Sequence, residues 1–98
     1  MNPPLLLYNN FFYNPTRAAA LIGLSDECLF KWAARCCTGY GYKITVIEHA
    51  GRLLIAERDV RIMADVQRAF PVRRGPVHPD RQKQMRIYAA RLARLRHR

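Results

Sequence analysis

Two helix-start signals separated by a single glycine constrain this chain most strongly. Asn14 can accept hydrogen bonds from the N–H groups at the start of a helix, and Pro15 suits the first helical position because it has no N–H. Gly23 can take the left-handed conformation that ends a helix, and Ser25 can cap the next helix. The sequence therefore predicts two short helices joined by a three-residue turn, which is a helix-turn-helix.

The second of these helices has one apolar face. Four of its residues recur at helical spacing and are expected in the core: Leu24, Cys28, Leu29 and Trp32. Trp32 could instead stack on single-stranded bases, but its spacing favours the core. The side chains left pointing outward are Asp26, Glu27, Phe30, Lys31 and Arg35.

A β-hairpin and a third helix are predicted next. Residues 43–48 are rich in β-branched side chains, Gly51 suits a tight turn, and residues 52–55 form the second strand. The third helix runs from about residue 57 to residue 70, where Pro71 ends it. Its mixed charges are typical of a solvated helix face: Glu57, Arg58, Asp59, Arg61, Asp65 and Arg68.

The basic charge is concentrated at the C-terminal end. Residues 1–70 carry eight Lys and Arg against six Asp and Glu, whereas residues 71–98 carry nine against Asp80 alone. The net charges are therefore +2 and +8, which together give the +10 of the whole chain. Such a charge indicates a polyanionic partner, with nucleic acid favoured over an anionic membrane.

The C-terminal residues are expected to form a linker and a helix. Residues 71–79 contain three prolines, and residues 80–98 form a basic helix or tail. Its apolar positions repeat at three and four, as in a helix–helix seam: Met85, Tyr88, Leu92 and Leu95. Three interpretations are open, namely an arm that folds on phosphates, a helix that pairs with a neighbouring subunit or an integrase, and a disordered tail. The seam favours the first two together.

Residues 1–13 are apolar but short. They lack a basic start and are interrupted by asparagines, so they fit neither a signal peptide nor a membrane span. We expect an arm that packs on the core or on a neighbouring subunit. The side chains expected to make that contact are Leu6, Phe11 and Phe12.

No arrangement of residues indicates catalysis, a cofactor, a small-molecule substrate or a metal site. The only serine, Ser25, is assigned to a helix cap, and no Cys/His or carboxylate pair is placed for chemistry. The histidines are scattered, at positions 49, 78 and 97. Three cysteines, two of them adjacent, make no disulfide framework and indicate reduced thiols in a cytoplasmic protein.

The order helix, turn, helix, hairpin, helix is that of a winged helix-turn-helix. The expected fold is therefore mainly α with a small β-hairpin, formed by residues 14–70, plus the basic C-terminal helix. Over about two thirds of its length the chain resembles the excisionase-like branch of the MerR-type winged-helix domains, which includes phage excisionases and recombination directionality factors. The resemblance lies in NPTRAAALIGLSDECLFKW (14–32), GRLLI (51–55) and ERDV (57–60).

The resemblance implies that the second helix enters the DNA major groove and that the hairpin reaches the adjacent minor groove or its phosphates. Lys31 and Arg35 can donate to phosphate or guanine. Phe30 either touches a thymine methyl or packs on the hairpin. Asp26 and Glu27 depart from a basic recognition helix, so they either accept from cytosine N4 or only pair with the helix dipole.

The hairpin and a set of basic residues complete the predicted interface. His49 and Arg52 flank the turn, where an arginine suits the narrow minor groove, although a solvated charge is the alternative. Further candidates for phosphate contact are Arg17, Lys43, Arg73 and Arg74.

Three functional hypotheses follow. The first is an excisionase or recombination directionality factor that binds tandem duplex sites cooperatively, bends DNA and acts with a tyrosine or serine integrase in the bacterial cytoplasm or nucleoid. The second is a transcriptional regulator of the same fold that binds a promoter as a dimer. The third is a structural or adaptor protein whose basic tail binds RNA or an assembly. None of the three involves a membrane.

Overall fold

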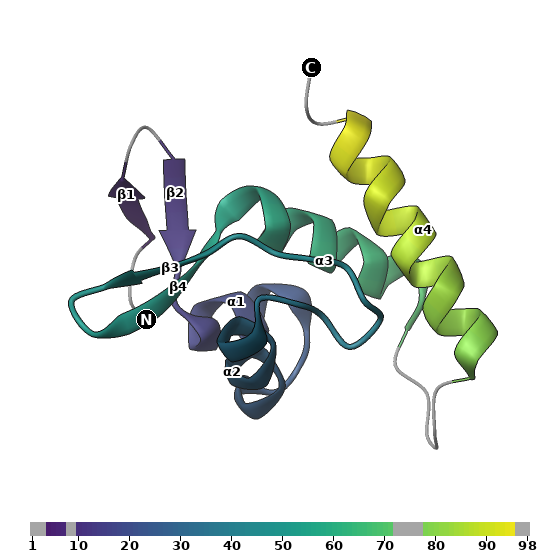
Figure 1. Ribbon diagram of the computed structural model, residues 1–98, viewed down its shortest axis with the longest axis horizontal. Helices are drawn as coiled ribbons and strands as arrows, with labels where there is room; N and C mark the ends of the chain where they lie inside the picture. The colour runs from purple at the N-terminus through teal and green to yellow at the C-terminus, as the bar shows by residue number, and fades with distance from the viewer. Residues whose placement is uncertain (1–3, 8–9, 72–77, 96–98) are drawn as a thin grey trace.

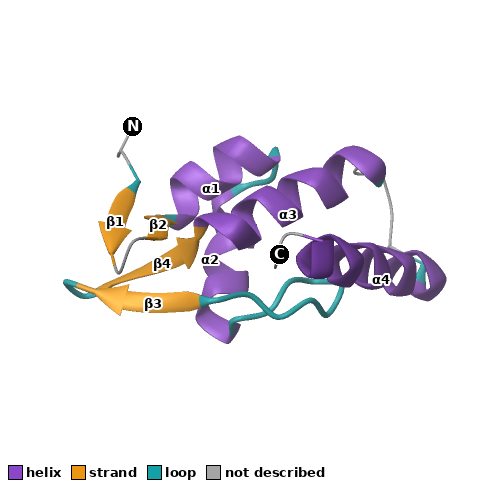
Figure 2. Ribbon diagram, turned by 90° about the horizontal axis from the view of Figure 1, so that it is seen from above, coloured by secondary structure: helices purple, strands orange, loops and turns teal. Residues whose placement is uncertain are grey.

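The computed structural model describes residues 4–7, 10–71 and 78–95, which form a mostly helical fold with one antiparallel sheet (Figure 1). The sheet lies at one end of the molecule and the last helix at the other, with three helices between them (Figures 1 and 2). The elements in chain order are β1 (Leu5–Leu7), β2 (Asn10–Tyr13), α1 (Pro15–Ile22), α2 (Asp26–Arg35), β3 (Val46–His49), β4 (Arg52–Ala56), α3 (Glu57–Ala69) and α4 (Pro79–Leu95).

The two predicted helix starts and the turn between them are confirmed. Asn14 Oδ1 accepts a hydrogen bond from the backbone N–H of Arg17 at 2.7 Å, and Ser25 Oγ accepts one from Cys28 at 3.2 Å. Gly23 ends α1 with a φ of 89°, a conformation that is costly for a residue with a Cβ. Local sequence signals therefore set both ends of the α1–α2 connection.

The predicted hairpin is formed by β3 and β4. Its two central residues, Ala50 and Gly51, have φ values of 51° and 75°, which are the positive values of a type I′ turn. His49 and Arg52 are directly paired at the end of the hairpin. The first strand is shorter than predicted, because it begins at Val46 rather than near Lys43.

The N-terminal residues form part of the sheet, which the sequence analysis did not predict. β1 pairs with β2, and β2 pairs with β4 through Phe12 opposite Ala56 and Tyr13 opposite Ile55, so the strand order is β1-β2-β4-β3. Residues 1–13 were expected to form an arm that packs on the core or on a neighbouring subunit; β1 and β2 pack within the chain, as strands that were not predicted. Phe12, expected to meet a partner, is buried with only 6 % of its surface exposed.

The main core lies between the first three helices and the sheet. Its buried members are Ala18, Ala19, Ile22, Leu29, Ala33, Ile44, Ile55, Val60 and Met63. The predicted inward face of α2 is confirmed, because Leu29 is fully buried and Leu24, Cys28 and Trp32 pack half-buried against this core. This packing turns the opposite face of α2 to solvent.

A second core attaches α4 to the rest of the chain. Its buried members are Tyr40, Ile62, Val66, Met85 and Ala89. Tyr88 and Leu92 pack half-buried against them, and Trp32 contacts both cores. The predicted seam therefore packs largely on α3 within the chain, which corrects the expectation that Met85, Tyr88 and Leu92 meet a partner; Leu95 is exposed.

Aromatic contacts strengthen the start of α4. The Phe70 and Tyr88 rings meet edge to face at 5.9 Å, and the Arg81 guanidinium lies 5.4 Å from the Phe70 ring centroid. Arg81 Nη2 also donates to the Pro71 carbonyl at 2.8 Å. Pro79 is the first residue of the helix, so α4 begins one residue earlier than predicted, and residues 72–77 of the predicted linker lie outside the described residues.

Asp59 is buried, with 4 % of its surface exposed, although the charge pattern predicted a solvated position. Its two carboxylate oxygens accept hydrogen bonds from the Tyr42 hydroxyl at 3.1 Å and from the Thr45 backbone N–H at 2.7 Å. It also lies in the first turn of α3, where the helix dipole favours a negative charge. Asp59 therefore ties the loop between α2 and β3 to α3.

Replacing Asp59 tests this connection. We expect Asp59→Ala to lower the free energy of unfolding by about 2–3 kcal/mol, because the Thr45 backbone N–H and the Tyr42 hydroxyl, both in partly buried hydrogen bonds, lose their acceptor. Urea denaturation measures the change. Asp26→Ala is the matched control, since Asp26 also lies in the first turn of a helix but is exposed, and it should cost less than about 1 kcal/mol. Equal losses in the two variants would contradict the role of Asp59.

Tyr42 makes the free energy of unfolding fall as the pH rises through the alkaline range. Burial, followed by the nearby Asp59 charge and its hydrogen bond, raises the pKa of Tyr42 from 10.0 to about 12. The protonated phenol is therefore favoured in the folded state, and its stabilisation is present below pH 10 and lost as the pH rises towards 12. We expect urea denaturation between pH 9 and 11 to show a shallower loss of stability in Tyr42→Phe than in the unmodified chain. Identical slopes would show that Tyr42 contributes nothing to this dependence.

Candidate nucleic-acid interface

The outward face of α2 carries the residues predicted for it. Asp26, Glu27, Phe30, Lys31 and Arg35 are all exposed. Phe30 exposes 52 % of its surface, which is unusual for a large aromatic side chain. The face therefore combines two acids, two bases and one solvent-facing ring.

Two of the charges on α2 are paired with each other. Lys31 Nζ lies 3.4 Å from Glu27 Oε1, and both side chains are more than two thirds exposed. An exposed pair of this kind contributes little to stability and exchanges readily with other partners. Arg35 Nε donates to the carbonyl of Cys37 at 3.1 Å, which holds the Arg35 side chain near the end of α2.

A groove of about 540 Å³ joins α2 to the start of α1 and to the hairpin turn. Phe30 lines it from α2, Arg17 from α1, and Arg52 from β4. The other residues that line it are Asn14, Pro15, Thr16, Gly51 and Leu53. Phe30 is therefore next to the hairpin and still largely exposed, and two arginines from different elements share one surface with it.

The remaining predicted residues of the hairpin side are exposed. His49 and Arg52 lie opposite each other at the end of the hairpin, and both are exposed. Lys43 is also exposed, and a backbone bridge between Cys37 and Lys43 places it beside the end of α2, near Arg35. Arg73 and Arg74 lie outside the described residues.

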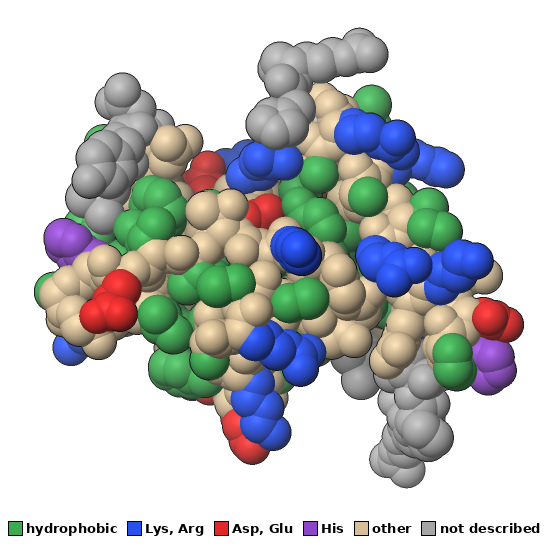
Figure 3. All heavy atoms as spheres, in the orientation of Figure 1, with side chains coloured by type: hydrophobic (Ala, Val, Ile, Leu, Met, Phe, Trp, Pro, Cys, Tyr) green, Lys and Arg blue, Asp and Glu red, His purple; other side chains and the backbone are tan. Residues whose placement is uncertain are grey.

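Four of the basic side chains that the sequence places in the C-terminal helix lie on the exposed side of α4. Figure 3 shows Lys and Arg side chains gathered over α4, at the opposite end of the molecule from the hairpin. The exposed bases of this helix are Lys83, Arg86, Arg91 and Arg94. Arg86 also approaches the loop after α2, because a Cβ atom at Gly41 would lie 3.3 Å from Arg86 Cδ. The sequence located this charge and the apolar seam opposite it, but it could not show that the seam packs on α3 of the same chain.

Two of the predicted partner contacts remain open to solvent near the sheet. Leu6 and Phe11 are paired across β1 and β2 and are 55 % and 42 % exposed. Leu95, near the end of α4, is 60 % exposed. Of the side chains predicted to contact a partner, Leu6, Phe11 and Leu95 are therefore the ones that remain largely exposed.

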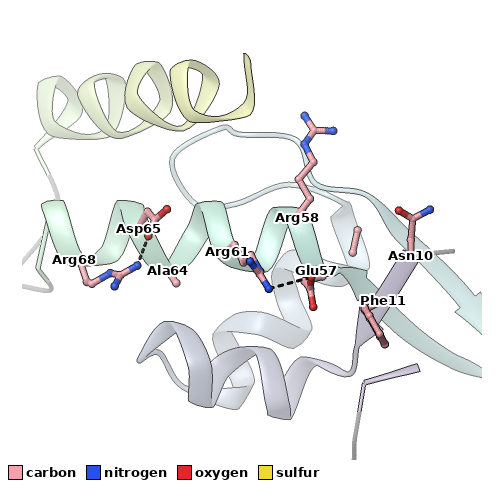
Figure 4. A pocket seen from close by; sticks show the side chains of 9 residues that line it. Asn10, Phe11, Glu57, Arg58, Arg61, Ala64, Asp65 and Arg68 are labelled. Atoms are coloured by element: carbon pink, nitrogen blue, oxygen red, sulfur yellow. Dashed lines mark hydrogen bonds and ion pairs between the residues drawn. The ribbon is translucent and has the colours of Figure 1, made fainter. Parts of the chain in front are cut away.

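A second groove runs along α3 beside β2, and Phe11 lines it (Figure 4). Four of its five charged side chains pair along the helix, with Arg61 Nη2 3.3 Å from Glu57 Oε1 and Arg68 bound to Asp65, and Arg58 is the fifth. The Tyr13 hydroxyl also donates to Glu57 at 2.9 Å. Because most of these charges pair with each other, this groove is a weaker candidate for an anionic ligand than the surface around Phe30.

Several features are absent from the part of the chain that the structure describes. No group of three or more His, Cys, Asp and Glu side chains is placed to hold a metal ion there. No helix within those residues is long and apolar enough to span a membrane.

Comparison with known proteins found no family model, no curated protein and no solved structure that matches the chain.

The thiols differ in accessibility. Burial raises the pKa of Cys28, although the nearby Arg35 and Lys31 charges act in the opposite direction, whereas Cys36 is exposed at the end of α2. We expect iodoacetamide at neutral pH to modify Cys36 several-fold faster than Cys28, since the thiolate is the reactive form. Peptide mass spectrometry of a time course measures both rates. Equal rates would contradict the inward position of Cys28.

Proposed function

We propose that this chain is a winged helix-turn-helix protein that binds duplex DNA, with α2 as the recognition helix and the β3–β4 hairpin as the wing. We further propose that it acts as an excisionase or recombination directionality factor. In that role, several copies bind tandem sites, bend the DNA and direct an integrase towards excision. The resemblance of residues 14–32, 51–55 and 57–60 to excisionase-like domains supports this specific role.

The observation that carries the DNA-binding proposal is the surface shared by α1, α2 and the hairpin. Phe30, Arg17 and Arg52 come from three elements and line the same groove. An α-helix fits the DNA major groove, which is about 12 Å wide, whereas the minor groove is about half as wide. A helix beside a narrow hairpin can therefore occupy adjacent grooves of one duplex.

The side chains of α2 suit contact with bases and phosphates. Lys31 can exchange its exposed partner Glu27 for a phosphate or a guanine at little cost in stability. Glu27 is then available to accept a hydrogen bond from cytosine N4. Phe30 is exposed enough to contact a thymine methyl group. In this arrangement the acids contribute to sequence discrimination rather than to affinity.

The hairpin end suits the minor groove. The two-residue turn at Ala50 and Gly51 keeps the end narrow, and Arg52 is the first residue after it. The negative potential of a narrow minor groove attracts a guanidinium group. His49, opposite Arg52, offers a second donor on the same end.

Contacts between neighbouring copies would supply the cooperativity that tandem binding requires. Leu6 and Phe11 form an exposed apolar pair across the edge strand β1 and its neighbour β2. Burial of such side chains against a second copy would favour adjacent occupancy of DNA sites. This pair is our candidate for that contact.

Selection from a random duplex library, followed by footprinting, tests the proposal with the full chain. We expect one short preferred site, and we expect the double variant Lys31→Ala, Arg35→Ala to lose at least about tenfold in affinity for it, since each base or phosphate contact contributes about 1–3 kcal/mol. Arg61→Ala is the matched control, because Arg61 is an exposed helical arginine whose partner Glu57 lies on its own helix, as Lys31 pairs with Glu27. It should bind within about twofold of the unmodified chain.

The same selected site separates the specific roles. Cooperative binding to direct repeats supports the recombination role, whereas an inverted repeat bound as a dimer indicates a promoter regulator instead. Recovery of no preferred duplex site, with binding unaffected by Lys31→Ala and Arg35→Ala, would overturn the assignment of α2 as a recognition helix.

A further inference from the structure

In the residues that the structure describes, the exposed Lys and Arg side chains of α4 have no acidic partner, whereas several Lys and Arg side chains of α2 and α3 do. Lys31, Arg61 and Arg68 each lie beside an acid on their own helix. In contrast, none of the exposed bases of α4 forms an ion pair within the described part of the chain. The only acid of α4, Asp80, lies in its first turn, 3.7 Å from His78. Among the described residues, the positive charge of α4 is therefore not neutralised by ion pairs.

The orientation of α4 is fixed by its apolar side. Met85 and Ala89 are buried against α3 and Tyr40, and Phe70 contacts both Tyr88 and Arg81. The opposite side of the helix carries Lys83, Ile87, Ala90 and Arg94. Arg86 and Arg91 lie on the flanks of that side. The rise of 1.5 Å per residue separates Lys83 from Arg94 by about 16 Å along the helix axis, comparable to about five base pairs of duplex.

The helix α4 lies on the far side of α2, which carries Phe30, from the β3–β4 hairpin (Figures 1 and 2). The longest extent of the molecule is 38 Å, and it runs from the β3–β4 hairpin at one end to α4 at the other, with α2 between them (Figures 1 and 2). That extent matches about 11 base pairs at 3.4 Å each. The molecule is thus long enough to span about one turn of a duplex.

We propose that the exposed side of α4 is a second DNA-binding surface, which contacts the phosphates on one flank of the site read by α2 and the hairpin. This inference rests on the proposed function, because it assigns α4 to the same duplex. The helix is already docked on α3, so it binds as a preformed surface rather than as an arm that folds on DNA.

Charge and packing favour a nucleic-acid backbone over other partners for this surface. Five Lys and Arg against one acid over residues 79–95 complement a polyanion. A helix that lies on a membrane needs a wide apolar face towards the lipid, but the apolar seam of α4 packs on α3, and Ile87 and Leu95 are the only large apolar side chains exposed within residues 79–95. The same burial leaves little of the seam for pairing with a partner helix.

Neutralisation of the four exposed bases tests the inference. The full chain carrying Lys83→Gln, Arg86→Gln, Arg91→Gln and Arg94→Gln is titrated against a 30-base-pair duplex of mixed sequence between about 50 and 300 mM KCl, with fluorescence anisotropy as the readout. The slope of log K against log salt should fall by about 0.9 for each phosphate that α4 no longer neutralises, which is up to about 3.6 for four phosphates. An unchanged slope would overturn the inference.

Two controls keep the test independent of folding. Lys83→Arg, Arg86→Lys, Arg91→Lys and Arg94→Lys preserves the charge and should preserve the slope, and thermal unfolding by circular dichroism checks both variants. If the fourfold Gln variant unfolds, Lys83→Gln and Arg94→Gln are measured singly, and each should lower the slope by up to about 0.9. Two single variants with unchanged slopes would also overturn the inference.

Footprinting on the selected site distinguishes this inference from the proposed function. Loss of protection on one flank only, with the centre of the site still protected, supports a phosphate-contacting α4. An intact footprint in the fourfold Gln variant, together with its loss in Lys31→Ala, Arg35→Ala, overturns the role of α4 and leaves the proposed function standing. The affinities of the unmodified chain and the fourfold Gln variant are also compared for a 30-nucleotide single-stranded RNA and for anionic vesicles. A larger loss of affinity for either of these than for the duplex overturns the assignment of this surface to DNA.

Discussion

The two hydrogen bonds accepted by Asp59 hold together the parts of this protein that lie far apart in its sequence. They fix the loop between α2 and β3 against the first turn of α3, through the Tyr42 hydroxyl and the Thr45 backbone. The same loop sends Tyr40 into the core shared by α3 and α4. The hairpin therefore starts from a fixed point, and α4 docks beside a fixed loop. A carboxylate buried without these donors would be strongly unfavourable, so the loop and Asp59 depend on each other.

The parts of the fold that the sequence predicted correctly depend on local signals. The caps at Asn14 and Ser25, the glycine at position 23 and the hairpin turn each act within a few residues. The inward face of α2 follows from helical spacing alone, and with it the exposed candidate site on the other face. These signals were sufficient for α1, α2 and the β3–β4 hairpin, and for the residues that those elements present to solvent.

The parts that the sequence did not predict depend on contacts between distant residues. β2 joins the sheet only because Phe12 and Tyr13 pair with Ala56 and Ile55, and no short-range pattern identifies that edge as the partner. Asp59 has the same spacing as an exposed helical acid, and only the approach of Tyr42 and Thr45 buries it. The seam of α4 was visible, but its partner was not, because α3 of the same chain and a helix of another subunit offer similar apolar surfaces. The groove that joins Arg17 to Arg52 likewise exists only after the sheet has packed on the helices.

The pairing of β2 with β4 also sets an order of events during synthesis. Phe12 leaves the ribosome well before Ala56, its partner in the sheet, and at about 5–20 residues per second the interval is roughly 2–9 s. During that time β1 and β2 have no sheet to join, and their leucine and phenylalanine side chains stay uncovered. Closing such a long loop is slow compared with forming α1 and α2, whose contacts are local. The N-terminal strands are thus made first but can join the sheet only after β4 has been made, and their apolar side chains are open to chaperone binding or aggregation in that interval.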